Sequence, residues 1–77
     1  MKELLEYLAR TLVDRPDEVS VESFEEDDGT IVLELQVADD DAGKVIGRGG
    51  RTVAALRTVI KATAVRDGQR VLVDVVD

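Results

Sequence analysis

The spacing of apolar residues in the N-terminal part of the chain is helical. Apolar side chains recur there at intervals of three and four, which predicts a helix over residues 3–14 with one buried face. Pro16 disfavours helical geometry at the residue before it, so we expect this helix to end near Asp14. The residues predicted to face the core are Leu4, Leu5, Leu8, Ala9 and Leu12.

Two segments with the alternation typical of β-strands follow. Strands are predicted over residues 18–25, which begin with Val19 and Val21, and over residues 30–38, where the alternation is clearest. An Asp-Asp-Gly turn separates the two strands. Phe24 breaks the alternation of the first strand, so either a bulge precedes it or its side chain packs from the other face of the sheet.

The second half of the chain predicts two helices and a strand. A short helix is expected over residues 40–46 and a longer one over residues 51–66, with a glycine-rich connection at residues 47–50. A valine-rich strand is expected over residues 70–76. The apolar face of the longer helix consists of Val53, Leu56, Ile60, Thr63 and Ala64. No linker or repeat divides the sequence, so we predict one domain over residues 1–77 with the order α-β-β-α-α-β.

Composition excludes several classes of function. The chain has no Cys and no His, which excludes disulfides, zinc sites with those ligands and nucleophiles activated by His. No pairing of the remaining reactive side chains suggests a catalytic site, and 77 residues leave little room for a concave pocket. No apolar run approaches the roughly 20 residues that a membrane span needs. We therefore expect no enzymatic activity, no cofactor, no small-molecule substrate and no membrane association.

An acidic run at residues 39–41 precedes the short predicted helix. Acidic side chains are favoured at helix N-termini, so we interpret the run as an N-cap and a first helical turn. The alternative is a site for a hard cation such as calcium. The residue pattern of a calcium-binding loop is absent around the run, which favours the first interpretation.

The charged residues are divided unevenly between the two halves of the chain. The net charge is −7, but residues 1–41 carry a balance of −11 and residues 42–77 a balance of +4. Residues 43–66 contain no acid and hold the basic residues Lys44, Arg48, Arg51, Arg57, Lys61 and Arg66. This basic segment is either a local site for an anion or a solvated helix face that the acidic half balances.

The glycine-rich connection is the most informative motif in the chain. It does not match a Walker A loop, which needs Gly-Lys followed by Ser or Thr, and it lacks the third glycine of a dinucleotide-binding loop. The remaining pattern is Ile46-Gly47-x-x-Gly50-x-x-Val53 between two predicted helices. Gly47 permits a sharp chain reversal, Gly50 permits an anion to approach a helix start, and Arg48 supplies positive charge. The alternative is a simple turn between helices with a solvated arginine.

This pattern and the element order resemble the K-homology (KH) domain, whose G-x-x-G loop clamps the backbone of about four nucleotides. The order is that of the type II, or prokaryotic, KH fold, and residues 39–62 are similar to the small bacterial KH proteins of the KhpA family. The resemblance implies an α+β domain with a three-stranded mixed sheet and helices packed on one face. It also implies non-catalytic binding of single-stranded RNA in the cytoplasm, in post-transcriptional regulation or as an RNA chaperone. Members of the family form homodimers, or heterodimers with a larger KH-containing protein, KhpB.

The resemblance also assigns roles to individual residues. The predicted RNA-binding residues are Gly47, Arg48, Gly49 and Gly50 as the clamp, Ile46 and Val53 as framework residues, and Lys44, Arg51 and Arg57 as a basic rim. Relatives usually carry a long polar or basic side chain where this chain has Gly49, so we expect one phosphate contact fewer. The aromatic residues Tyr7 and Phe24 lie far from the loop in the sequence. We therefore expect no stacking platform and only modest affinity.

A second interpretation makes the chain a protein-interaction or dimerisation module on a KH scaffold, with RNA affinity residing mainly in a partner protein. The acidic net charge, the scarcity of aromatic residues and Gly49 favour this interpretation. Ala55, Val59 and Ala62 lie off the core-facing stripe of the longer helix, where they would form either a flat dimer contact or a solvated face rich in helix-forming alanine.

Overall fold

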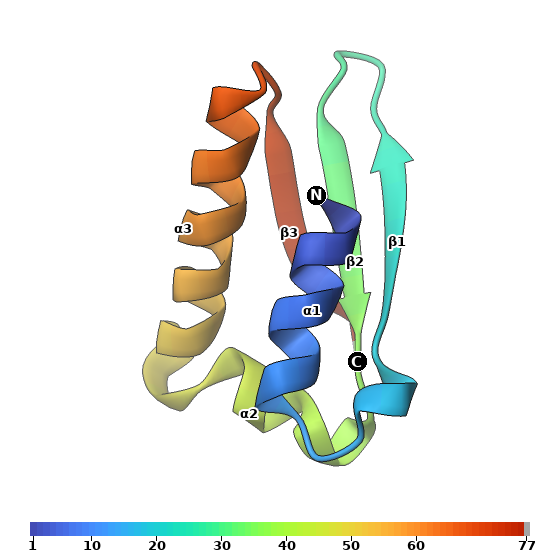
Figure 1. The fold of residues 1–77 in the computed structure, drawn as a ribbon, viewed down its shortest axis with the longest axis vertical. Helices are drawn as coiled ribbons and strands as arrows, with labels where there is room; N and C mark the ends of the chain where they lie inside the picture. The colour runs from blue at the N-terminus through green and yellow to red at the C-terminus, as the bar shows by residue number, and fades with distance from the viewer. Residues whose placement is uncertain (77) are drawn as a thin grey trace.

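The computed structural model describes residues 1–76 as three α-helices and a three-stranded sheet, joined by short 3₁₀ turns (Figure 1). The predicted order α-β-β-α-α-β is confirmed. In chain order the elements are α1 (Lys2–Leu12), η1 (Pro16–Glu18), β1 (Ser20–Glu25), β2 (Ile31–Gln36), η2 (Asp39–Asp41), α2 (Ala42–Ile46), η3 (Arg48–Gly50), α3 (Arg51–Arg66) and β3 (Val71–Val76).

The sheet is mixed, with β2 between β1 and β3. The Asp-Asp-Gly turn returns the chain directly, so β1 and β2 pair antiparallel, from Ser20 opposite Gln36 to Glu25 opposite Ile31. The crossover through α2 and α3 makes β3 parallel to β2. Figure 1 shows α1 and α3 on the same face of this sheet. The fold is therefore α+β with the type II KH order, as predicted.

The core lies between the helices and the covered face of the sheet and is aliphatic. Its fully enclosed side chains come from every α-helix and from the central strand, so each amphipathic face predicted from the sequence contributes. The buried residues at its centre are Leu5, Ala9, Leu33, Leu35, Val45, Ile60 and Ala64.

Among residues 1–76, no helix covers the opposite face of the sheet (Figure 1). The pairing of β1 with β2 is continuous, without a bulge, and Phe24 lies opposite Val32 with nearly half of its surface exposed. Of the two interpretations of Phe24, packing on the other face is therefore correct. In the next row of this face, Glu22, Glu34 and Asp74 lie directly opposite one another across the three strands. This row of carboxylates makes the middle of the open face acidic, next to the apolar row that contains Phe24.

The first helix ends at Leu12, before the predicted end near Asp14. Val13 is extended, and the backbone N–H groups of Asp14 and Arg15 donate to the carboxylate of Asp41 rather than to helix carbonyls. A carboxylate distant in the sequence thus terminates the helix. Leu12, the last residue of the helix, was predicted to face the core but has 37% of its surface exposed and does not pack against the core cluster.

The acidic run also differs from its predicted role. Residues 39–41 form the separate turn η2, and α2 begins only at Ala42. Asp41 is the N-cap residue of α2, as predicted, but neither η2 nor α2 has a side-chain hydrogen bond at its N-cap, so capping by a side chain is the part of the prediction that is wrong. Within residues 1–76, no group of three His, Cys, Asp or Glu side chains is arranged to hold a metal ion. In that same part of the chain, no helix is both long and apolar enough to cross a membrane.

Candidate nucleic-acid interface

The glycine loop between α2 and α3 depends on backbone angles that side chains rarely adopt. Gly47 has φ 78° and ψ 169°, Gly49 has φ 65° and ψ 19°, and Gly50 has φ 77° and ψ 13°. The conformation of Gly47 is essentially confined to glycine, whereas the other two lie in the left-handed helical region. The backbone conformation of the loop therefore favours glycine at all three of these positions.

The glycines differ in what surrounds them. A Cβ atom on Gly47 would lie 2.7 Å from Cβ and 2.8 Å from the backbone N of Thr52, and closer still to the hydroxyl of Thr52. A Cβ on Gly49 or Gly50 would meet no atom within 4 Å. Gly47 therefore packs the loop against the first turn of α3, and Gly49 and Gly50 leave open space above it.

The open side of the loop has the electrostatics of an anion site. Gly50 is the N-cap residue of α3, a helix of 16 residues, and no side chain hydrogen-bonds to this helix end. The partial positive charge of the helix start is therefore available to a ligand. Arg48 and Arg51 flank this point, and both are exposed. Because Gly49 has no side chain, backbone N–H groups and two guanidinium groups can approach the same phosphate group.

A groove of about 340 Å³ lies between α3 and β3. Arg57, Thr58 and Lys61 line it from the helix, and residues 71–74 line it from the strand. The Nε–H of Arg57 donates to the backbone carbonyl of Val73 at 3.1 Å, which ties the helix to the strand across the groove. Lys61 was not among the predicted site residues. Its spacing of one helical turn from Arg57 was the signal that could have identified it.

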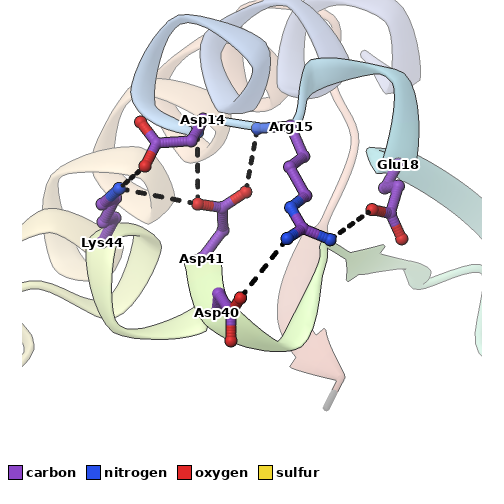
Figure 2. A network of polar contacts seen from close by, with 6 residues as sticks. All are labelled: Asp14, Arg15, Glu18, Asp40, Asp41 and Lys44. Atoms are coloured by element: carbon purple, nitrogen blue, oxygen red, sulfur yellow. Dashed lines mark hydrogen bonds and ion pairs between the residues drawn. The ribbon is translucent and has the colours of Figure 1, made fainter.

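Three of the predicted site residues have surroundings that differ from those of the two loop arginines. Val53 is buried, in keeping with a framework role, but Ile46 has 38% of its surface exposed. The residue that anchors α2 in the core is its neighbour Val45. The ammonium of Lys44 pairs with the carboxylates of Asp14 and Asp41 (Figure 2). Lys44 therefore has two anionic partners within the protein.

Sequence reasoning missed the buried carboxylate of Asp41, which is only 1% exposed. The backbone N–H of Asp14 donates to Oδ1 at 3.1 Å, and that of Arg15 donates to Oδ2 at 3.0 Å (Figure 2). Desolvation alone would raise the pKa of Asp41, but these two donors and the charge of Lys44 outweigh it and hold the pKa below 3.8. The hydrogen bond to Asp14 raises the pKa of Lys44 in turn.

The lowered pKa of Asp41 predicts a pH dependence of stability. A carboxyl group whose pKa is lower in the folded state stabilises the fold fully above its ordinary pKa of 3.8, and this contribution is lost as the pH falls through the folded value. Urea denaturation at about pH 6 and about pH 3 should therefore show a smaller acid-induced loss for Asp41→Asn than for the wild type. Equal losses in the two proteins would contradict the assignment.

The mixed sheet, the order α-β-β-α-α-β and a G-x-x-G loop between the last two helices define a type II KH domain. Comparison with known families agrees with this class, because the KH domain of KhpA and KhpB matches residues 2–75. The chain belongs to the KhpA/KhpB family of KH domains.

Individual relatives are similar over their whole length. The protein named RNA-binding protein KhpA in Clostridium acetobutylicum is 53% identical over 76 residues, which cover 99% of this chain and 100% of the relative. The protein of the same name in Halalkalibacterium halodurans is 50% identical over 78 residues and covers 100% of both chains. That of Clostridium perfringens is 45% identical over 76 residues, or 99% of this chain and 100% of the relative.

Proposed function

We propose that this chain is a non-catalytic protein that binds single-stranded RNA, with the glycine loop on the phosphate backbone and the α3–β3 groove under the nucleotides. The observation that carries this proposal is the open space at Gly49 and Gly50, between two exposed arginines, at the uncapped start of α3. The names of the relatives, which describe RNA-binding proteins, support it.

The groove indicates how bound nucleotides would be held. A strand that leaves the loop along α3 would pass Arg57 and then Lys61, both of which line the groove. The opposite wall is the start of β3, where Leu72 and Asp74 are the exposed side chains, so bases would rest on Leu72 and on guanidinium planes. The carboxylate of Asp74 repels phosphates from the strand side of the groove and favours a path of the RNA backbone along α3. Contacts of this kind favour modest affinity with little sequence preference.

The cellular setting follows from the same proposal. We place the protein in the cytoplasm, in post-transcriptional regulation or RNA chaperoning, where a sequence-tolerant grip on single strands is useful. The family joins KhpA with KhpB, which supports a KhpB-like protein as a partner beside a second copy of this chain.

An NMR titration of amide shifts with a short single-stranded RNA tests the proposal. We expect shifts at residues 47–51 and at the groove residues Arg57 and Lys61, and we expect them to weaken as salt rises, because phosphate contacts release counterions. A folded spectrum in which these residues do not respond to RNA would overturn the proposal. A single-stranded DNA of the same sequence, titrated in parallel, measures the preference for ribose.

A second candidate function, self-association, is favoured by an apolar surface between α1 and α3. Val59 and Leu12 are 45% and 37% exposed on it, and Ala55 and Leu8 line it with them. We call these four residues the α1–α3 patch. Its lining is almost wholly apolar, and it lies on the side of α3 away from the residues of the RNA groove. Dimerisation through this patch would leave the loop free to bind RNA.

A charge in the α1–α3 patch should prevent self-association. Val59→Asp places a carboxylate in this patch, where burial against a second copy would strip its water. We expect light scattering over a range of concentrations to show the wild type as a dimer and Val59→Asp as a monomer. Val65→Asp is the control, because Val65 is 70% exposed on the same helix but outside the patch. A wild type that is monomeric throughout would contradict the prediction.

A further inference from the structure

We infer that Asp41, together with Asp14 and Lys44, forms a clasp that sets the position of the glycine loop, and that Lys44 acts within this clasp rather than as an RNA ligand. Asp41 is thus a positioning residue for the proposed RNA binding, on which this inference rests. The clasp joins two segments that are distant in the sequence, the connection between α1 and η1 and the N-terminal end of α2 (Figure 2).

The clasp holds α2 at its N-cap and again about one turn further along. At the N-cap, both carboxylate oxygens of Asp41 accept backbone N–H groups of the α1–η1 connection. One turn later, Lys44 hydrogen-bonds to the carboxylate of Asp14 and lies 3.7 Å from Oδ1 of Asp41. Arg15 adds an outer contact, since its guanidinium lies 3.6 Å from Asp40 and 3.5 Å from Glu18. The connection and the helix therefore move as one unit.

The position of the loop depends on this unit because α2 is so short. Its five residues separate Asp41 from Gly47, a rise of about 8 Å along a helix axis. A helix of this length is not stable alone, and its orientation is decided by the contacts it makes. On the apolar side, Val45 and Ala42 pack against the core. On the polar side, the clasp provides the contacts, and Gly47 begins the loop directly after the helix.

The arrangement gives Lys44 a different role from the one that the resemblance assigns to it. A lysine that binds phosphate needs an ammonium free to leave its partners, whereas Lys44 has two carboxylates around it. The two roles predict opposite effects of removing Asp14. If Lys44 binds RNA, loss of Asp14 releases it and strengthens binding. If Lys44 belongs to the clasp, loss of Asp14 loosens α2 and weakens binding.

Asp41→Asn tests the clasp directly. The amide retains one acceptor oxygen but presents N–H donors to a second backbone donor, so at least one hydrogen bond is lost. We expect altered amide shifts for the loop glycines without RNA, and a Kd for RNA raised about ten-fold if the binding-competent loop position falls to about a tenth of the population. Val21→Ala is the control, because it weakens the buried core from β1 and Val21 takes no part in the hydrogen bonds and ion pairs of the clasp. It should lower stability and leave both loop shifts and Kd unchanged.

Normal loop shifts and a normal Kd in folded Asp41→Asn would overturn the inference. If wild-type protein binds no RNA, the proposed function fails, and the loop shifts of Asp41→Asn against Val21→Ala still decide whether the clasp exists.

Asp14→Asn tests the clasp with little risk to folding, because the side chain of Asp14 is 76% exposed. Asp17→Asn is the matched control, since it removes the same charge from an exposed position in η1 that makes no ion pair within residues 1–76. We expect RNA binding about three-fold weaker for Asp14→Asn than for Asp17→Asn. Equal or tighter binding would overturn the assignment of Lys44 to the clasp.

Discussion

Gly47→Ala should destabilise the protein by about 3 kcal/mol or more, enough to unfold much of a domain this small. Two independent causes add at this position. The backbone angles of Gly47 are unfavourable for any residue with a Cβ, and that Cβ would be driven against Cβ and the backbone N of Thr52. Backbone atoms at the start of α3 cannot move aside without shifting the helix.

Gly49→Ala is the matched comparison within the same loop. Its φ is also positive, but a Cβ would enter open space, so only the left-handed backbone conformation is penalised. We expect a loss of about 1–2 kcal/mol, measured for both variants by urea denaturation at neutral pH. Similar losses for the two alanine variants would show that the contact with Thr52 does not matter.

A double variant identifies the cause of the larger loss. Thr52→Ala removes the hydroxyl, which is the atom nearest to the added methyl, but leaves Cβ and N in place. Gly47→Ala should therefore be less harmful in the Thr52→Ala background, and part of the penalty should remain. Gly47 is therefore required for folding, and any effect of Gly47→Ala on RNA binding follows from its effect on the loop conformation.

Arg48→Asp combined with Gly49→Asp should weaken RNA binding by about 100-fold while leaving the fold intact. Both positions belong to the loop on which the proposal places a phosphate group, so each new carboxylate repels the ligand. Arg48 and Gly49 are exposed, and Asp is among the residues that tolerate the left-handed conformation of Gly49. We therefore expect circular dichroism and urea denaturation to show a folded protein.

The chain offers a matched control for this pair. Arg66 and Gly68 are an arginine and a positive-φ glycine at the far end of α3, and a Cβ on Gly68 also meets open space. Arg66→Asp with Gly68→Asp changes the net charge by the same amount at a distance from the loop. Fluorescence anisotropy with a labelled RNA, measured at several salt concentrations, should show a much smaller loss for the control. Equal losses in the two double variants would mean that the loop has no special role.

The acidic residues on the open face of the sheet are compatible with RNA binding at the loop and at α3. Glu22, Glu34 and Asp74 repel one another across the strands, an arrangement that tends to destabilise a sheet. The same charges keep phosphates away from the open face and leave the loop and α3 as the surface with positive charge. The net charge of −7 is thus consistent with an anionic ligand, because the basic residues are gathered in one segment.

Apolar periodicity and glycine spacing were sufficient to predict the element order and the core. The helical repeat of Leu5 and Ala9 and the alternation of Leu33 and Leu35 depend on local geometry, which places each side chain on one face of its own element. The glycine loop could also be predicted from the sequence, because few residues other than glycine adopt the positive φ that Gly47 has. These features are properties of neighbouring residues in the chain.

The tertiary structure alone decided which polar side chains have partners. In the sequence, Asp41 is one acid in a run of three, and only the fold shows that its carboxylate binds the backbone N–H groups of residues 14–15. The ion pair of Lys44 with Asp14 likewise forms only because α2 packs beside the end of α1. The hydrogen bond from Arg57 to the carbonyl of Val73, and the groove around it, also form only when β3 lies beside α3. Hydrogen bonds and ion pairs between distant segments are set by how the amphipathic elements pack, and no local period in the sequence records that packing.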